Sequence, residues 1–397
     1  MMDFGKVTDI HLPEGEAVKI ERNGAALWSK PAMLYVSLGD SIAAGHTIND
    51  SWSWEYGEGS QYGVNGNTST AIVRNCYTDL IHGGMADRYG AEYVRAASFA
   101  RSGDTVADLM AKLDHEGVKS AIGKAALVTV CIGANDVLQP ALMDLEDYIQ
   151  TGDLSNAEAV IEANFARLSD DSNATSYMAL LNKLKGLNPD ARFVFMTVYN
   201  PYKYLWIDEG RDGFFAPILS TIPQMDFFGI DIDNLIKDGL LSTSVVQTLF
   251  DRVNGLGEWA EQRVTRLNEI IRSKVAAAGP NFSIAETKAA FDLVPDRPVS
   301  APYHYNDLVS VEYTRGYDTM QMDWGALWRA EYGDNVAQYW LDLAMKYVSW
   351  SGLDIGGFAT DLVTQMVEKV IVPDVDPHPE PYGHLVLARA FADVLEA

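Results

Sequence analysis

Residues 33–45 of this chain are MLYVSLGDSIAAG, an apolar run that ends in a glycine, an acid, a serine and small residues. A short apolar run closed by glycine is typical of a buried strand, and the small residues after it suit a tight turn into a helix. Four further runs have the same texture: AEYVRAASFARSG (91–103), ALVTVCIGAND (126–136), RFVFMTVYNP (192–201) and, more weakly, NFSIAETK (281–288).

Patterns of helical period lie between and after these runs. Apolar residues recur at helical spacing over 106–113, 177–187, 385–395 and, most clearly, 258–278. Strands that alternate with helices favour a mostly parallel sheet covered on both faces. We therefore predict an α/β protein with three layers, α/β/α, around a mostly parallel five-stranded sheet.

The N-terminal part of the chain and two internal stretches depart from this alternation of strands and helices. Residues 4–30 carry valine and isoleucine in rough alternation and contain Asn23-Gly24, a dipeptide that favours hairpin turns. We predict an N-terminal β-hairpin module over 1–31 and a main domain over 32–397. Within the main domain we expect helical insertions at about 203–257 and 298–372, which cover the ligand-binding edge of the sheet.

The charge balance excludes some partners. The chain has 30 lysines and arginines against 55 aspartates and glutamates, a formal net charge of −25. Nucleic acids and anionic membranes reward clustered basic residues, and the sequence has no such cluster. We expect neither as a partner, and the sequence does not indicate an oligomeric state.

The sequence also bears on location. Residues 1–30 contain no apolar core of a signal peptide, and no segment has the uninterrupted apolar length of a membrane span. We expect a soluble protein without a signal peptide in this chain. Cys76 and Cys131 lie in segments that suit burial and do not indicate a disulfide framework.

Three of the strand-like runs end in residues that can do chemistry, and in an open parallel sheet such ends meet at one edge. Ser41 can present its hydroxyl there, although a single serine at a helix start is more often an N-cap. Gly103 and Asn135 offer a backbone N–H and an amide, donors of the kind that stabilise an oxyanion. Either residue, taken alone, is more often part of a turn.

Residues 372–384, VPDVDPHPEPYGH, place His378 on a proline-rich loop beside acidic residues. An aspartate bound to one ring nitrogen would leave the other nitrogen able to accept a serine proton. The alternative is a metal site of Asp374, Asp376 and His378. Three neighbours on one loop make a poor closed site, so we predict no metal.

In order along the chain, the blocks GDSIAAG (39–45), ARSGDT (100–105), GAND (133–136) and DPHPEPYGH (376–384) resemble the marker blocks of the SGNH hydrolases, also called GDSL-like lipases and acylhydrolases. Each block alone is unspecific, and the ordered set is specific. Tyr199-Asn200-Pro201 at the end of the fourth run also looks like this family.

The resemblance implies a flavodoxin-like sheet and a serine ester hydrolase that needs no cofactor. By position, Ser41 is the nucleophile and His378 the general base. The oxyanion hole is implied to consist of the Ser41 and Gly103 N–H groups and the Asn135 amide.

One departure from the family pattern concerns the carboxylate that orients His378. The family's aspartate lies three residues before the histidine, where this chain has Val375. The orienting residue is then Asp376 or Asp374, and we favour Asp376 because Asp-Pro-His-Pro resembles a variant within the family. A Ser-His dyad is the alternative. We assign the later His384 to capping or packing at the start of the last helix.

We expect a small-molecule or glycan ester as substrate, with an acetyl or short acyl group on a carbohydrate. The tyrosines and tryptophans of 298–372 have faces that suit sugar rings, although most such residues usually form the core of a subdomain. The alternatives are a lipase or lysophospholipase-type acylhydrolase, or a non-catalytic glycan-binding or phage structural module on a vestigial hydrolase fold. Residues 7–28 resemble short β-modules of phage tail proteins. We therefore expect a cytoplasmic or a virion-associated location, and the resemblance implies the second.

Overall fold

The computed structural model describes residues 32–45, 75–144, 151–201, 244–294 and 381–396, and short pieces elsewhere, including 378–379 and parts of 11–29 and 345–357. Most of the predicted insertions at 203–257 and 298–372 lies outside the described residues. The aromatic surface expected over 298–372 therefore stays a prediction.

The core of the protein is a sheet of five parallel strands, as the sequence predicts. Its strands are β5 (Met33–Gly39), β6 (Val94–Ser98), β7 (Ala125–Cys131), β8 (Arg192–Met196) and β9 (Phe282–Ala285). They lie side by side in the order β6-β5-β7-β8-β9, which is the flavodoxin-like order. The strand order reverses at β5, between β6 and β7, and ligands of such sheets bind outside the carboxyl ends at this point.

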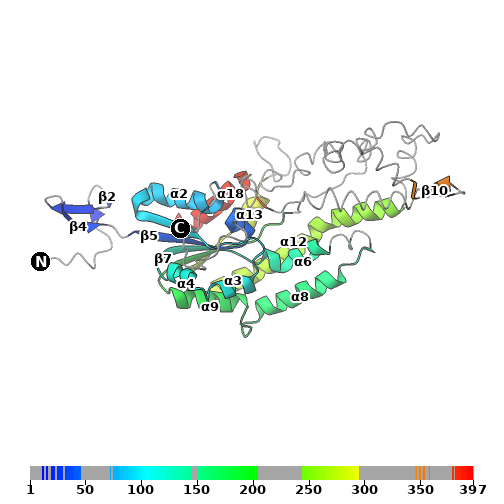
Figure 1. Ribbon diagram of the computed structural model, residues 1–397, viewed down its shortest axis with the longest axis horizontal. Coiled ribbons are helices and arrows are strands. Elements are labelled where there is room, and N and C mark those ends of the chain that lie inside the picture. The colour runs from blue at the N-terminus through cyan, green and yellow to red at the C-terminus, as the bar shows by residue number, and fades with distance from the viewer. Residues whose placement is uncertain are drawn as a thin grey trace.

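Helices cover both faces of the sheet, which completes the predicted three layers (Figure 1). One face carries α2 (Tyr77–Tyr89), α13 (Thr287–Asp292) and α18 (Pro381–Glu396). The other carries α3 (Val106–Lys112), α4 (Glu116–Ile122), α9 (Tyr177–Leu187) and α12 (Ser244–Ala278), with α8 (Ser155–Ser169) beside α12. Because helices cover both faces, the strands are apolar along their length, and Val36, Val128 and Val194 are fully buried.

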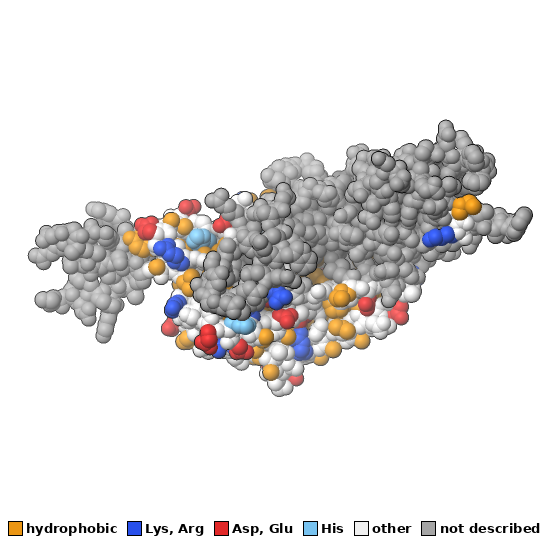
Figure 2. Space-filling model, viewed as in Figure 1, with side chains coloured by type: hydrophobic (Ala, Val, Ile, Leu, Met, Phe, Trp, Pro, Cys, Tyr) orange, Lys and Arg blue, Asp and Glu red, His pale blue; other side chains and the backbone are white. Residues whose placement is uncertain are grey.

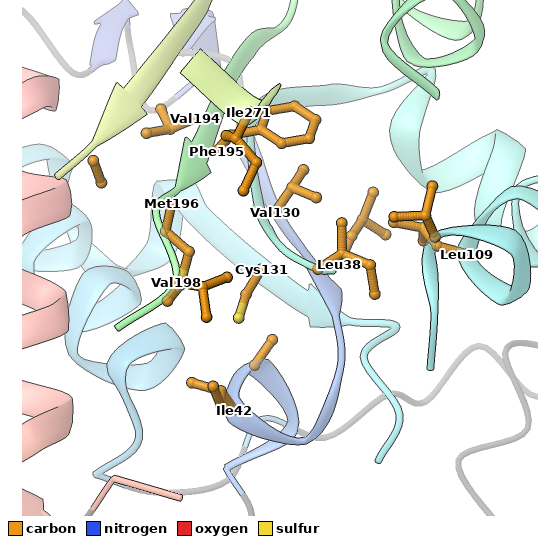
Figure 3. Packing of buried hydrophobic residues seen from close by; sticks show 14 of the residues in the cluster. Leu38, Ile42, Leu109, Val130, Cys131, Val194, Phe195, Met196, Val198 and Ile271 are labelled. Atoms are coloured by element: carbon orange, nitrogen blue, oxygen red, sulfur yellow. The ribbon is translucent and has the colours of Figure 1, made fainter. Parts of the chain in front are cut away.

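The helix α12 is longer than the sequence pattern indicates, since it begins at Ser244, within the range assigned to the first insertion. Its apolar side packs on the sheet, and Figure 3 shows Ile271 of α12 beside Phe195 of β8. Asn268 lies on this buried side and binds the chain just beyond β8. Its Oδ1 accepts the Val198 N–H at 2.7 Å, and its Nδ2 donates to the Val198 carbonyl at 2.8 Å.

Short antiparallel pairs lie outside this core. In the N-terminal region β3 (Lys19–Arg22) pairs with β4 (Ala25–Ser29) around Asn23-Gly24, as the hairpin pattern predicts, and β1 (His11–Leu12) pairs with β2 (Gly15–Glu16). A further pair, β10 (Val348–Ser349) and β11 (Gly352–Leu353), falls within the second predicted insertion.

The described surface and helices bear on the charge distribution and on membrane spans. Figure 2 shows acidic and basic side chains interspersed over the described part of the visible face. Among the described residues, no helix combines the length and the apolar character needed to cross a bilayer.

Replacing Asn268 should destabilise the fold. In Asn268→Leu the Val198 N–H and carbonyl lose their partners inside the core, and each buried group left without a partner costs about 1–3 kcal/mol. We expect the free energy of unfolding in urea to fall by roughly 2–4 kcal/mol. Glu269→Ala, at the next, exposed position of α12, is the control and should change it little. An Asn268→Leu protein as stable as the wild type would contradict this role.

Candidate active site

The turn from β5 into α1 (Ser41–Ala44) places Ser41 at the carboxyl edge of the sheet. Gly39 has φ +146°, and a Cβ built on it would lie 2.1 Å from the carbonyl oxygen of Cys131. No side chain fits at this contact, so the position requires glycine. The next residue, Asp40, donates its N–H to the same carbonyl at 3.0 Å. These two contacts fix the path of the chain immediately before Ser41.

The helix α1 is capped by Asp40 and not by Ser41. The Asp40 side chain accepts the Ile42 N–H at 3.1 Å, and Asp40 has the extended backbone of an N-cap. The capping role that a lone serine would most often have is therefore taken by its neighbour. Ser41 is 8% exposed at the first helical position, with its hydroxyl not needed as a cap.

Gly103 lies in the loop between β6 and α3. Its φ is +84°, and a Cβ built on it would meet no atom within 4 Å. The glycine is thus favoured by the left-handed backbone, and the space beside it is open. The loop is closed by the Asp104 N–H, which donates to the Arg101 carbonyl at 3.2 Å, and it ends where Thr105 caps α3.

Asn135 lies in α5 (Ala134–Val137), directly after β7. Its Nδ2 donates to the Asp104 carbonyl at 2.9 Å. An amide group has two N–H donors, so this bond leaves the second one for another acceptor. The bond also ties the loop that carries Gly103 to the first turn of α5.

Asp136, the residue after Asn135, strengthens this connection. It is buried, its carboxylate accepts the Val106 N–H at 3.0 Å, and it is paired with Arg167 of α8. Burial raises the pKa of Asp136, whereas the Val106 and Arg167 contacts oppose that rise. Through Asp136, the GAND block (133–136) thus fixes the first turn of α3.

A buried ion pair fixes the loop that contains Gly103. Lys112 of α3 is 3% exposed; it is paired with Asp104 and donates to the Phe99 carbonyl at 2.7 Å. Burial raises the pKa of Asp104 and lowers that of Lys112, and each charge opposes the shift of the other. Sequence reasoning missed this pair. The available signal was a lysine three residues after Leu109, on the apolar side of a predicted helix.

His378 is half-buried in the loop before α18. Burial raises the pKa of Asp40, the residue next to Ser41, and lowers that of His384; the electrostatic influence of His378 opposes the first shift and adds to the second. The imidazole is thus electrostatically coupled to the Ser41 turn. Asp376 and Asp374 lie outside the described residues, so the identity of the orienting carboxylate stays a prediction.

His384 has a structural role, as the sequence indicates. It is fully buried in α18, and its Nδ1 accepts the Tyr77 N–H at the start of α2 at 3.1 Å. Its ring also stacks on the Tyr77 ring at a centroid distance of 6.1 Å. Burial lowers the pKa of His384 to about 3, so this histidine stays neutral.

Thiols, metal-ligating side chains and cavities among the described residues are further places where a ligand could bind. Cys76 and Cys131 are buried free thiols. Within the described ranges, no group of three histidine, cysteine or acidic side chains could hold a metal ion. A cavity of about 530 Å³ lies between α2 and α18, but it is lined by Met33, Ala126 and Arg192, at the amino-terminal ends of the strands. It is therefore on the opposite edge from Ser41.

Comparison with known proteins identifies related sequences and folds. The sequence model of the GDSL-like lipase/acylhydrolase family matches residues 35–391. A search of curated proteins found no match.

Solved structures with similarity to the chain include two enzymes at 16% sequence identity. The phospholipase A1 of Streptomyces albidoflavus NA297 matches over 66% of this chain and 82% of its own, with a TM-score of 0.37. The acetylxylan esterase Axe2 of Geobacillus stearothermophilus matches over 91% of this chain and 94% of its own, with a TM-score of 0.38.

His384 should make stability depend on pH. Its pKa is about 3 in the folded chain and near 6.5 when unfolded, so the unfolded state binds the extra proton between these values. The stabilisation is complete above pH 6.5 and is lost as the pH falls toward 3, by about 1.4 kcal/mol per pH unit. We expect the unfolding free energy of the wild type to fall more steeply with acid, over this range, than that of His384→Gln. Equal slopes would show that His384 is not buried as a neutral cap.

Proposed function

Since the chain belongs to the GDSL-like lipase/acylhydrolase family, we propose that it is a serine ester hydrolase with Ser41 as nucleophile and His378 as general base. The observation that carries the proposal is the meeting of three loops at one edge of the sheet. Ser41, Gly103 and Asn135 follow β5, β6 and β7, which are adjacent strands, and the hydrogen bond from Asn135 to the Asp104 carbonyl joins two of these loops.

In the proposed reaction, the Ser41 oxygen attacks the ester carbonyl while its proton passes to His378. The Ser41 and Gly103 N–H groups and the second N–H of the Asn135 amide stabilise the oxyanion. His378 then gives the proton to the leaving alcohol, and an acyl-enzyme remains on Ser41. Water, activated by His378, releases the acid and restores the hydroxyl. Asp376 is proposed to orient the imidazole through its other nitrogen.

The local charges support this chemistry. Both aspartates beside the oxyanion donors, Asp104 and Asp136, are paired with buried or half-buried cations. Without Lys112 and Arg167, two buried negative charges would oppose the developing oxyanion. The pairing therefore removes a repulsion from the place where negative charge is expected to form.

We propose an acetyl or short acyl ester of a carbohydrate as the substrate. The support is the density of tyrosine and tryptophan in 298–372, together with charged residues that do not suit the lid of a lipase. The resemblance of residues 7–28 to phage tail modules supports an N-terminal module that carries the enzyme on a virion, where host-surface glycans would be in reach.

Loss of the nucleophile should abolish activity without loss of the fold. We expect Ser41→Ala to release no p-nitrophenol from p-nitrophenyl acetate above background, and Asn135→Ala to lower kcat by about 10²–10³-fold through the loss of an oxyanion donor. Ser273→Ala, a serine on α12 far from the turn in sequence, is the control and should keep full activity. Thermal unfolding midpoints show whether each variant is folded. Undiminished turnover by folded Ser41→Ala would refute the assignment.

A panel of esters should identify the substrate class. We expect higher kcat/KM for acetylated xylan, acetylated glucosamine and p-nitrophenyl acetate than for long-chain nitrophenyl esters and lysophospholipid. A preference for long chains would instead support a lipase or lysophospholipase-type enzyme. If no ester is cleaved and a fluorophosphonate probe fails to label Ser41, the non-catalytic alternative is supported.

A further inference from the structure

Asp40 is a carboxylate buried directly beside the proposed nucleophile, with only 1% of the residue exposed. Its Oδ1 accepts the Ile42 N–H at 3.1 Å and faces the thiol of Cys131 at 3.4 Å. Its Oδ2 is also buried, yet it has no hydrogen-bond partner among the described residues. Capping of α1 accounts for the position of Oδ1 but not for the burial of Oδ2.

The neighbours of Asp40 do not neutralise that second oxygen. Cys131 of β7 contacts Asp40, and Tyr77 of α2 and Tyr177 of α9 interact with it electrostatically. Burial raises the pKa of each of these three groups well above its ordinary value. These three groups are therefore uncharged near neutral pH. The hydroxyl of Tyr77 is itself buried without a partner in the described part of the chain.

Two charged groups also act on Asp40. Asp104, from the loop after β6, raises the pKa of Asp40, but its charge is largely balanced by its pairing with Lys112. His378, from the loop before α18, lowers the pKa of Asp40. His378 is thus the group at which a positive charge can form and be stabilised by the Asp40 carboxylate.

Burial is the largest influence on Asp40 and raises its pKa to about 6. The carboxyl group therefore changes charge in the pH range where an ordinary imidazole also does. A buried carboxylate interacts with a nearby cation more strongly than an exposed one, because little water screens the pair. Asp40 is the residue next to Ser41, and its electrostatic interaction with His378, the proposed base, makes it relevant to proton transfer.

We propose that Asp40 is a positioning residue that acts through His378 and through α1. This inference rests on the proposed function. When the Ser41 proton moves to His378, the imidazole becomes a cation, and the Asp40 carboxylate stabilises that cation without taking the proton. The same carboxylate, through Oδ1, holds the first turn of α1 and so aims the Ser41 N–H. The Asp40 charge thus supports the base, in addition to the carboxylate of the His378 loop.

The variant Asp40→Asn tests the charge and keeps the cap, because an asparagine oxygen can still accept the Ile42 N–H. The first measurement is the NMR titration of the His378 ring, assigned with His378→Gln. We expect its midpoint to move to lower pH in Asp40→Asn, since the nearby negative charge that favours the imidazolium is gone. An unchanged midpoint overturns the inference, whether or not the protein cleaves esters.

The second measurement is the pH dependence of kcat/KM for p-nitrophenyl acetate. In Asp40→Asn we expect the plateau to fall about tenfold, equivalent to about 1.4 kcal/mol, and the acidic limb to move to lower pH. A lower plateau with an unmoved acidic limb would assign to Asp40 a capping role alone and overturn the inference. If the wild type cleaves no ester while the NMR midpoint shifts, the proposed function fails and the coupling holds.

Two further variants control these measurements. Asp108→Asn makes the same isosteric change in the capping box of α3, at an exposed carboxylate, and should leave the His378 midpoint and the acidic limb unchanged. If Asp40→Asn does not fold, Cys131→Ser serves instead. Its hydroxyl is a stronger donor to Oδ1 than the thiol, so Asp40 should stay ionised to lower pH and the His378 midpoint should move up. No movement in Cys131→Ser would likewise overturn the inference.

Discussion

The geometry of the candidate active site depends on the close approach of β5 and β7 at their last residues. The Cys131 carbonyl occupies the space that a side chain at Gly39 would need, at 2.1 Å, and it accepts the Asp40 N–H at 3.0 Å. A backbone contact this tight leaves the chain one path out of the strand. The direction of α1, the identity of its cap and the place of Ser41 all follow from that path.

The loops on either side of this turn are fixed by buried charges. Asp104 and Asp136 each accept a cation from a helix on one face of the sheet, Lys112 from α3 and Arg167 from α8. Removing one member of such a pair leaves an uncompensated buried charge and costs about 3–5 kcal/mol. Replacing both by apolar residues is often tolerated, so the pairs are better explained by the precise placement of Gly103 and Asn135 than by stability.

Much of the fold could be predicted from the sequence, because strands buried on both faces must be continuous apolar runs. Four of the five runs contain their strand, and β7 begins one residue before its run. The details of the candidate site were harder to predict from the sequence. The sequence suggests Ser41 as the cap of α1, whereas Asp40 takes that role. The choice is made by the contact of Gly39 with a strand that local sequence does not specify. The orienting carboxylate is ambiguous for a related reason: Asp374 and Asp376 both precede His378 by a few residues, and sequence spacing alone does not choose between them.

The net negative charge of the chain makes the Asp104–Lys112 and Asp136–Arg167 pairs more important for stabilising an anion. With 55 acidic and 30 basic residues, the average environment opposes the formation of an oxyanion. A long-range negative field is screened over about 10 Å in ordinary salt, so the charges within that radius decide the outcome. Lys112 of α3 and Arg167 of α8 reach the segments that carry Gly103 and Asn135, and each balances one aspartate there. An acidic protein can therefore stabilise a developing anion provided that its few cations are placed where the negative charge appears.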